Sequence, residues 1–224
     1  MIKLKIGNPK EKNKELIKLI KNVQINQFYL KNQKDFRDLI LSNIQKGDTV
    51  LDLGKGMREK FNMINCSKLE TLDVNEYDDY PDIICDLCGE INDDIKNRYD
   101  KIICLAVLEH VYNPFKAIEN ITKLLKDGGK VYGMVPYLYH YHAPDDLKFQ
   151  DYFRFSKDAL SYLFKDFKKV ELYPIRGKLS TSLNILLEGK WKKYIEKTKI
   201  NIFFNKFFNK NLDQCSGYNF ILKK

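Results

Sequence analysis

The sequence predicts an α/β fold, a doubly wound and mostly parallel sheet with helices on both faces. Five short β-like runs alternate with helical or loop sequence through the middle of the chain, and such alternation is typical of a parallel sheet. The run from Lys101 to Leu108 is almost wholly apolar, as expected for a strand that is buried on both faces. Ligands of such sheets bind beyond the carboxyl ends of the strands.

The length and composition fit a single domain over residues 1–224. Of the 224 residues, 44% are hydrophobic and 31% are charged. A chain of this size buries enough surface to fold without disulfides or metals, and the composition excludes a disordered or collagen-like protein. The five cysteines lie mostly in apolar runs, so we expect reduced thiols.

No apolar stretch approaches the ~20 residues that a membrane-spanning helix needs. The Lys-rich start of the chain also lacks the apolar core of a signal sequence. We therefore expect a cytoplasmic protein without membrane insertion. Cys85 and Cys88 are spaced as C-x-x-C, but the sequence has no second pair to complete a zinc site.

The net charge of +9 is concentrated at the two ends of the chain. Residues 1–34 carry +7, residues 35–164 carry −7 and residues 165–224 carry +9. Arginine, whose planar fork nucleic-acid sites recruit, occurs at five positions, and the excess of Lys and Asn is what an AT-rich genome produces. We therefore do not expect a nucleic-acid substrate, although the basic ends leave room for an anionic partner.

The chain before the sheet is predicted to be helical. Apolar residues recur at helical spacing between residues 10 and 31, and a second helix is expected over 35–45, so that residues 1–45 form an N-terminal helical extension. The β-like runs follow at residues 49–53, 69–74, 83–87, 101–105 and 130–135. Between the last two we expect a helix over 113–126, with Pro114 near its start and Gly128 beyond its end.

A segment rich in aromatic, His and Asp residues follows the fifth run. This segment, residues 136–156, is longer than a routine connection, and we expect it to form an insertion on the substrate side. The prediction is completed by a helix over 156–164, a strand over 169–174, a Lys-rich helical segment over 178–209 and a last strand over 217–222.

Acidic residues and glycines lie at the ends of three successive predicted strands. Asp52, Gly54 and Gly56 follow the first strand, where a helix should begin and where glycines let the backbone approach a ligand. Asp73 ends the second strand and can accept hydrogen bonds from ribose hydroxyls, whereas Asp86 ends the third and can accept from an adenine amino group. Together they predict a ligand-binding rim.

The sequence resembles class I S-adenosylmethionine (SAM)-dependent methyltransferases over roughly residues 45–175. The resemblance rests on Val-Leu-Asp-Leu-Gly-Lys-Gly at 50–56, the strand ends at Asp73 and Asp86, Leu108-Glu-His-Val111, and Leu124-Leu-Lys-Asp-Gly-Gly-Lys-Val131. The run Leu-Glu-His-Val followed by Asn-Pro is similar to the small-molecule "type 11" branch. The His- and Asp-rich segment resembles a bacterial subgroup of that branch.

The resemblance implies a seven-stranded Rossmann-like methyltransferase sheet with SAM as the cofactor. It assigns to the cofactor site Asp52, Gly54, Gly56, Asp73, Val74, Asp86, Leu87, Leu105 and Ala106. Two residues depart from the family pattern. Lys55 stands between the glycines, where a small or apolar residue is usual, and Arg58 stands where some members have a third glycine. A lysine beside a sulfonium is unfavourable unless its side chain points away.

The candidate catalytic bases are the three histidines, ranked His142, His140 and His110. They follow strands whose ends should face the methyl group, and an imidazole can take a hydroxyl proton near neutral pH. The predicted substrate-binding residues are Tyr137, Asp145, Asp146, Tyr152 and Arg154. His140 and His142 with the nearby aspartates also fit a divalent metal site, but we predict no metal. The alternative for the whole segment is a lid that simply packs on the core.

Taken together, these features predict a SAM-dependent methyltransferase, more specifically an O-methyltransferase. The expected acceptor is a small hydroxylated or phosphorylated molecule, such as a sugar or nucleotide-linked precursor in bacterial surface polysaccharide biosynthesis. One alternative is an RNA methyltransferase that grips the phosphate backbone with its basic ends. The other is an inactive pseudo-methyltransferase that binds a partner through Phe203, Phe204, Phe207 and Phe208. The oligomeric state is left open between monomer and dimer.

Overall fold

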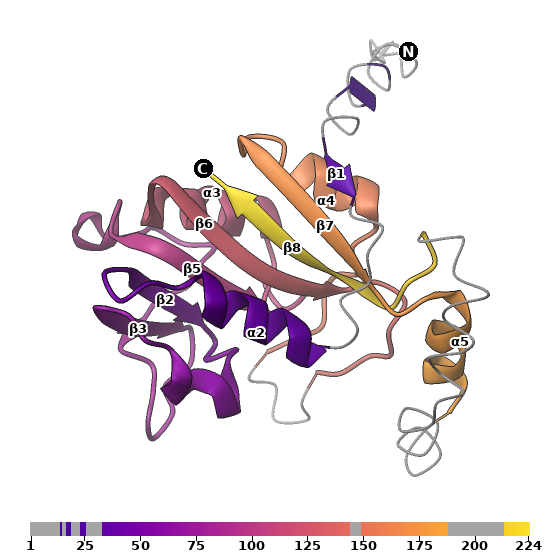
Figure 1. Ribbon diagram of the computed structural model, residues 1–224, viewed down its shortest axis with the longest axis horizontal. Helices are drawn as coiled ribbons and strands as arrows, with labels where there is room; N and C mark the ends of the chain where they lie inside the picture. The colour runs from indigo at the N-terminus through magenta and orange to yellow at the C-terminus, as the bar shows by residue number, and fades with distance from the viewer. Residues whose placement is uncertain (1–13, 15–16, 19–22, 26–32, 144–148, 188–212) are drawn as a thin grey trace, which may run out of the picture.

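The computed structural model of the protein describes residues 14, 17–18, 23–25, 33–143, 149–187 and 213–224. These residues form one eight-stranded sheet in the order β1-β7-β8-β6-β5-β2-β3-β4 (Figure 1). β8 is antiparallel to its neighbours β6 and β7, and the other pairs of strands are parallel. The predicted mostly parallel α/β sheet is therefore confirmed.

All seven predicted strands are present, and they differ from the prediction mainly at their ends. They are β2 (Thr49–Leu53), β3 (Lys68–Asp73), β4 (Ile83–Ile84), β5 (Tyr99–Leu105), β6 (Leu125–Pro136), β7 (Lys169–Ile175) and β8 (Gly217–Lys223). The α-helices are α2 (Gln33–Asn43), α3 (Pro114–Leu124), α4 (Lys157–Leu163) and α5 (Lys178–Leu186). β6 is longer than predicted because the chain passes from α3 directly into the sheet.

Helices cover both faces of the sheet, as predicted. In Figure 1, α2 crosses in front of the sheet, whereas α3 and α4 lie behind it. Side chains of β5 alternate between the two faces. Ile103 and Leu105 pack in one apolar cluster with Phe36 and Ile40 of α2. Ile102 and Cys104 pack in the other, which includes residues of α3 and α4.

The predicted helix over 10–31 is interrupted by an eighth strand. Lys14, Ile17 and Lys18 are helical, but the chain bends at Val23 and β1 (Gln24–Ile25) pairs with β7. The prediction was wrong here because β7 would otherwise be an open edge of the sheet, and an unpaired edge attracts a strand. The helical periodicity before residue 23 gives no sign of this long-range contact.

The expected helix after β2 is also different in the structure. Residues 54–57 form a turn, and the chain then enters a 3₁₀ helix, η1 (Arg58–Met63). Gly54, Lys55 and Arg58 all have positive φ, at 64°, 49° and 47°. An α-helix requires negative φ at every residue, so it does not form across this turn.

The C-terminal helical prediction is confirmed in part. α5 covers residues 178–186 of the predicted segment 178–209, and Leu187 is no longer helical. The four phenylalanines between residues 203 and 208 lie outside the described residues. Within the described ranges, no helix has both the length and the apolar character needed to cross a membrane.

The segment 136–156 folds back against the chain that follows β5. At its base, the Phe155 N–H donates to the Pro136 carbonyl at 3.0 Å. The N–H groups of Tyr152 and Phe153 both donate to the carbonyl of Glu109, at 2.8 and 3.2 Å. The described parts of the predicted insertion therefore lie beside the carboxyl end of β5.

The Asp52 side chain stabilises the turn after β2. This side chain is fully buried, and its two oxygens accept hydrogen bonds from the N–H groups of Gly56 and Met57, at 2.9 and 3.0 Å. Burial raises the pKa of Asp52 from its ordinary value of 3.8 to about 7, although the two N–H donors oppose the shift. Asp52 thus fixes the backbone of the turn that contains the predicted glycines.

We expect Gly133→Ala to destabilise the protein. A Cβ at this position of β6 would lie 1.9 Å from Cζ of Phe220, which is fully buried on the paired strand β8. Overpacking of this kind costs typically about 1–3 kcal/mol, measurable by urea unfolding. The matched control is Gly47→Ala, whose Cβ would meet no atom within 4 Å. Equal stability of the two variants would contradict the packing described here.

Asp52→Asn is expected to change the pH dependence of stability. Between about pH 4 and pH 7 the folded protein retains the Asp52 proton that the unfolded chain has released. The stabilisation from that proton is therefore present at low pH and is lost as the pH rises towards 7. Asparagine cannot titrate, so the free energy of unfolding of the wild type should fall relative to that of the variant over this range. If the free energies of unfolding of the wild type and the variant, measured by chemical denaturation, changed in parallel with pH, the raised pKa of Asp52 would be refuted.

Candidate active site

The turn after β2 packs closely on the end of β5. A Cβ at Gly56 would lie 2.9 Å from Cβ of Leu105, so this position requires glycine. A Cβ at Gly54 would lie 3.7 Å from Oδ2 of Asp73. The turn therefore brings the glycines predicted for the cofactor site together with the end of β3 and with Leu105.

Asp73 lies at the end of β3 and is half-buried. The N–H of Asn75 donates to its Oδ1 at 2.9 Å. Burial raises the pKa of Asp73, against the effect of backbone hydrogen bonds from Asn75 and Val74. The neighbouring Val74 side chain is exposed. Carboxylate and valine thus lie side by side at the rim of the sheet.

Asp86 lies two residues beyond β4 and already has two internal donors. The N–H of Cys88 donates to its Oδ1 at 2.8 Å, and the Tyr112 hydroxyl donates to its Oδ2 at 2.7 Å. Leu87 is buried, and its carbonyl accepts from Nδ2 of Asn120 at 2.8 Å. These contacts fix the loop after β4 in position beside the loop after β5.

The Lys55 ammonium has partners within the protein. It forms an ion pair with the exposed Asp79. The same ammonium lies 5.1 Å from the ring centre of Tyr80 and 5.6 Å from that of Phe61, within the range of cation–π attraction. The charge of Lys55, which departs from the family pattern, is therefore balanced by Asp79 and by two aromatic rings.

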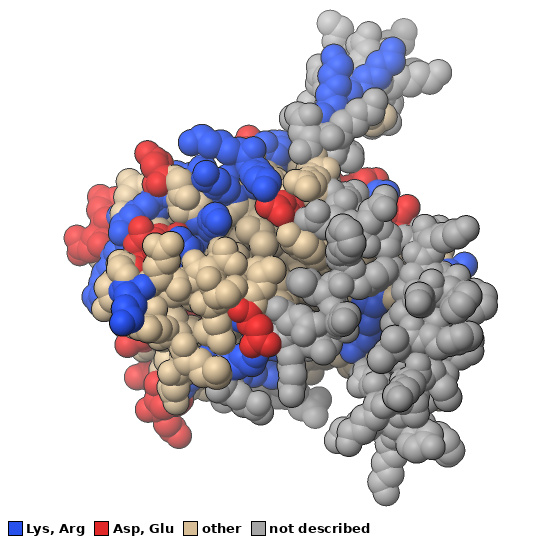
Figure 2. Space-filling view, in the orientation of Figure 1, with Lys and Arg blue, Asp and Glu red and all other residues tan. Residues whose placement is uncertain are grey.

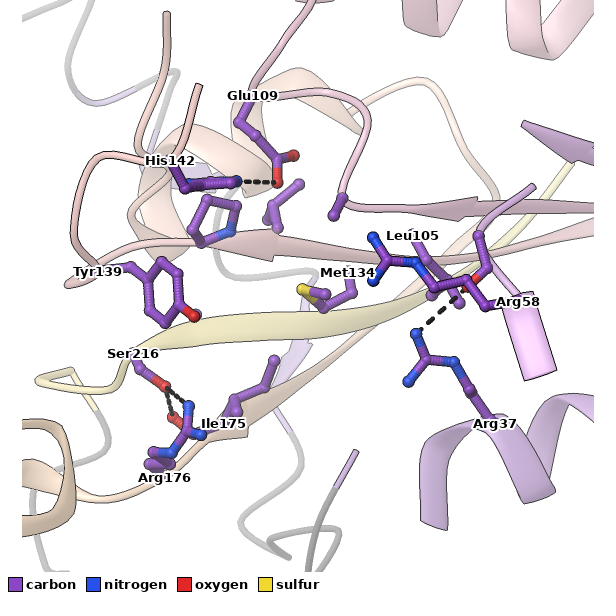
Figure 3. Close-up of a pocket in the computed structure, with 15 residues that line it drawn as sticks. Arg37, Arg58, Leu105, Glu109, Met134, Tyr139, His142, Ile175, Arg176 and Ser216 are labelled. Atoms are coloured by element: carbon purple, nitrogen blue, oxygen red, sulfur yellow. Dashed lines mark hydrogen bonds and ion pairs between the residues drawn. The ribbon is translucent and has the colours of Figure 1, made fainter. Parts of the chain in front are cut away.

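A cavity of about 240 Å³ opens beside the turn, at the carboxyl ends of β5, β6 and β7. Figure 3 shows three groups of side chains around it: Glu109 and His142, Arg176 and Ser216, and Arg37 and Arg58. The remaining lining residues are Gly56, Leu105, Ala106, Met134, Val135, Pro136, Tyr139, Ile175 and Gly217. Leu105, Ala106 and Gly56 of the predicted cofactor site thus share one cavity with His142.

Three of the five arginines in the chain line this cavity. Nη2 of Arg37 donates to the Gly56 carbonyl at 3.2 Å. Nη1 of Arg176 donates to the Ser216 hydroxyl at 3.2 Å, and Arg176 itself has a positive φ of 60°. Strained backbone of this kind is concentrated at functional sites. The cavity is therefore rich in guanidinium groups that can pair with an anion.

Glu109 faces His142 across the edge of the cavity (Figure 3). Its side chain is 1% exposed, and neither carboxylate oxygen accepts a hydrogen bond from any described residue. Nε2 of His142 is 3.8 Å from Oε1 of Glu109. Burial raises the pKa of Glu109 to about 8. Glu109 is the most weakly satisfied buried acid of the site.

The opposite edge of the His142 ring is fixed by Asp151. Nδ1 of His142 is 3.2 Å from Oδ2 of Asp151, and the His142 N–H donates to the same oxygen at 3.0 Å. The fully buried Asp151 side chain also binds Arg154 through both of its oxygens. Although burial acts in the opposite direction, hydrogen bonds from Arg154 and His142 lower the pKa of Asp151.

The structure brings His110 to His142 but does not bring His140 into the same group. His110 and His142 have ring centres 4.8 Å apart, and Nε2 of His110 is 3.9 Å from Oε1 of Glu109. His140 is exposed, stacks on Tyr139 at 4.1 Å and does not line the cavity. Of the three predicted bases, His142 is therefore the one that lines the cavity, and His110 lies behind it.

The predicted substrate-binding residues lie mostly outside the cavity. Arg154 is engaged within the protein, because it binds Asp151 and donates to the carbonyls of His140 and Phe153. The Tyr152 side chain is exposed. Tyr137 packs near Tyr218, with ring centres 6.3 Å apart. Asp145 and Asp146 lie outside the described residues.

Several lining residues were not predicted from the sequence. Glu109, Tyr139 and the three arginines line the cavity, and Asp151 positions His142 from behind. The scarcity of arginine in a Lys-rich chain was an available signal, because it makes each arginine a candidate for a specific role. The sequence offered no comparable signal for Asp151, whose contact with His142 depends on how the segment folds back.

A sequence profile described as "Methyltransferase domain" matches residues 21–169. No curated protein matches the sequence. Among solved structures, phosphoethanolamine N-methyltransferase 2 from Haemonchus contortus has a TM-score of 0.53 at 15% identity, covering 85% of this chain and 52% of its own. This chain therefore spans about half the length of the Haemonchus contortus enzyme.

Two further solved structures share the fold with similar TM-scores and sequence identities. A Haloferax volcanii methyltransferase in complex with the Trm112 activator has a TM-score of 0.53 at 17% identity, covering 83% of this chain and 87% of its own. The cyclase SpnF has a TM-score of 0.53 at 14% identity, covering 94% and 92%. Since the matching profile spans most of the chain and the motifs and sheet agree with it, the chain belongs to the methyltransferase-domain family of class I SAM-dependent methyltransferases.

Proposed function

We propose that this protein transfers a methyl group from SAM to an oxygen of a small, anionic, hydroxylated acceptor. One observation carries the proposal: a single cavity joins Gly56, Leu105 and Ala106 to His142, Glu109 and three arginines. The first group is where the family resemblance expects the methionine part of SAM. The second group would bind an anionic acceptor through the arginines and remove its hydroxyl proton through His142 with Glu109.

The cofactor's nucleoside is proposed to bind along the rim formed by the ends of β3 and β4. Asp73 is half-buried beside Gly54, which suits a carboxylate that accepts from ribose hydroxyls. Val74 is exposed next to it and offers an apolar surface to a base. Asp86 would share its Oδ2 between the Tyr112 hydroxyl and an adenine amino group, since a carboxylate oxygen can accept two hydrogen bonds.

The acceptor is proposed to carry a phosphate or carboxylate. Arg37, Arg58 and Arg176 line the cavity, and guanidinium groups bind such anions through charge-assisted hydrogen bonds. A sugar phosphate or a nucleotide-linked sugar of bacterial surface polysaccharide synthesis has this chemistry together with hydroxyl groups. The Haemonchus contortus N-methyltransferase was solved with phosphomonomethylethanolamine, which likewise carries a phosphate group.

In the proposed reaction, the acceptor oxygen attacks the methyl carbon in line with the carbon–sulfur bond. The new carbon–oxygen bond forms as the bond to sulfur breaks, and S-adenosylhomocysteine (SAH) leaves. Nε2 of His142 is proposed to accept the proton of the acceptor hydroxyl, with Glu109 3.8 Å away beside the resulting imidazolium. Asp151 would keep the imidazole in its orientation.

A nucleic-acid substrate has less support. Figure 2 shows both basic and acidic side chains on the described part of this face, with uncharged residues over its centre. Among the described residues, several lysines form ion pairs, such as Lys126 with Asp100 and Lys157 with Asp213. Within the described part of the chain, these paired charges of opposite sign do not make the continuous basic surface that binds a phosphate backbone.

Asp73→Ala is expected to weaken binding of SAH by at least tenfold in calorimetric titration. The substitution removes the carboxylate that would accept from the ribose hydroxyls, and each lost hydrogen bond to a charged group is worth about 1.5–3 kcal/mol. The control is Asp78→Ala, an exposed carboxylate in the same loop. If wild type and Asp73→Ala bound SAH equally, Asp73 would be removed from the cofactor site.

His142→Ala is expected to lower turnover by about 10²–10⁴-fold while sparing the affinity for SAH. Turnover would be followed by transfer of radiolabelled methyl from SAM to phosphorylated sugars and nucleotide sugars. His142 lies on the acceptor side of the cavity, so a loss confined to turnover would fit its proposed role. Unchanged turnover with a confirmed acceptor would exclude His142 from the reaction.

A further inference from the structure

The buried carboxylate of Glu109 is the feature of the site that still needs an explanation. Its side chain is 1% exposed, and its two oxygens accept no hydrogen bond from the described residues. A buried carboxylate without a donor is destabilising in general. Such a group at the wall of a cavity calls for a binding partner for its two oxygens.

Two imidazole nitrogens point at the same carboxylate. Nε2 of His142 and Nε2 of His110 lie 3.8 and 3.9 Å from Oε1 of Glu109. The three ligand atoms all lie within 4.8 Å of one another. Both distances exceed the 3.2 Å limit of an ordinary N–H···O hydrogen bond, so the three atoms converge without bonding to each other.

The surroundings of the two rings identify which nitrogen carries the proton. Nδ1 of His142 lies 3.2 Å from a carboxylate oxygen of Asp151 and 3.4 Å from the His140 carbonyl, and both neighbours are acceptors. Nδ1 of His110 lies 2.8 Å from the Gln150 carbonyl, another acceptor. In the neutral rings the proton is therefore assigned to Nδ1, and each Nε2 presents its lone pair towards Glu109.

Three electron-pair donors thus face one point, and neither Glu109 oxygen accepts a hydrogen bond from another described residue. We propose that Glu109, His110 and His142 bind a divalent first-row transition metal ion. Metal-ligating histidines usually donate their second N–H to a carboxylate or a backbone carbonyl, which is the arrangement of Asp151 and Gln150 here. Two ligands of a tetrahedral ion at ~2.1 Å are roughly 3.4 Å apart, so side-chain shifts of about half an ångström bring the three atoms into the coordination shell.

The ligand set defines the class of ion. Two imidazoles and one carboxylate suit Zn²⁺, Fe²⁺, Co²⁺ or Ni²⁺, whereas Mg²⁺ and Ca²⁺ prefer oxygen ligands alone. The site differs from the His140–His142 pair considered from the sequence, because the centres of those rings are 6.5 Å apart and His140 is exposed. Glu109, which takes the place of His140, comes from the chain after β5.

A bound ion would leave coordination positions open towards the cavity, because Glu109 and His142 both line it. An acceptor hydroxyl bound there would release its proton to water more easily, since a divalent ion lowers the pKa of a coordinated oxygen. This role deepens the proposed function and rests on it, and it makes His142 a ligand instead of the base. Metal binding itself does not depend on the methyl transfer.

The test is a titration of the full chain with Co²⁺ after treatment with a chelator, followed by visible absorption and calorimetry. We expect one equivalent to bind with d–d bands and to raise the unfolding temperature. Glu109→Gln and His142→Ala should each weaken binding by more than tenfold, whereas His140→Ala should leave it unchanged. A Cys85→Ser, Cys88→Ser variant should also bind normally, which excludes the C-x-x-C thiols as the ligands.

The proposal is overturned if the wild type binds no Co²⁺, or if Glu109→Gln and His142→Ala bind it as tightly as the wild type. Glu109→Gln preserves the shape of the side chain, and its unfolding temperature without metal shows whether the variant is folded. Titration of the same samples with SAH separates the two proposals. If the protein binds SAH but fails to bind Co²⁺, the metal site alone is rejected. If it binds Co²⁺ but fails to bind SAH, the cofactor site alone is rejected.

Discussion

The pairing of β5 with β2 on one side and with β6 on the other is the constraint on which the site depends. All three strands are parallel, so the residues that follow them emerge at one edge of the sheet. The Gly54–Gly56 turn, the chain around Glu109 and the start of the segment 136–156 therefore meet there. β8 runs in the opposite direction and adds Ser216 from the residues before its first position.

Three buried acids lie at this edge, and two of them are satisfied by hydrogen bonds. Asp52 accepts from two backbone N–H groups, and Asp151 binds the fork of Arg154 and the N–H of His142. Glu109 has neither kind of partner and faces two ring nitrogens instead. The first two carboxylates hold backbone and side chains in place. This contrast separates Asp52 and Asp151, whose roles are structural, from Glu109, whose oxygens are open to a ligand.

The strands and the positions of the glycines and aspartates at their ends were predictable from the sequence because their signals are local. An apolar run predicts β5, and glycine and aspartate at the strand ends predict the turn and Asp73. The contact of Glu109 with His142 joins residues 33 positions apart, and it depends on the return of the segment 136–156 to the chain after β5. No periodicity encodes such a contact. The pairing of β1 with β7 was missed for the same reason, since it joins residues more than 140 positions apart.

The size of the cavity bears on the acceptor. At about 240 Å³, it is below the roughly 300–1,000 Å³ of pockets that enclose a whole drug-sized ligand. Part of this volume is assigned to the methionine end of the cofactor, at Leu105 and Ala106. Under the proposed function, the rest would enclose the reacting end of an acceptor. Selectivity there would come from the arginines and from Glu109 with His142, which approach from different sides (Figure 3). An anion would fix one end of the acceptor, and the distance to His142 would decide which hydroxyl reaches the methyl group.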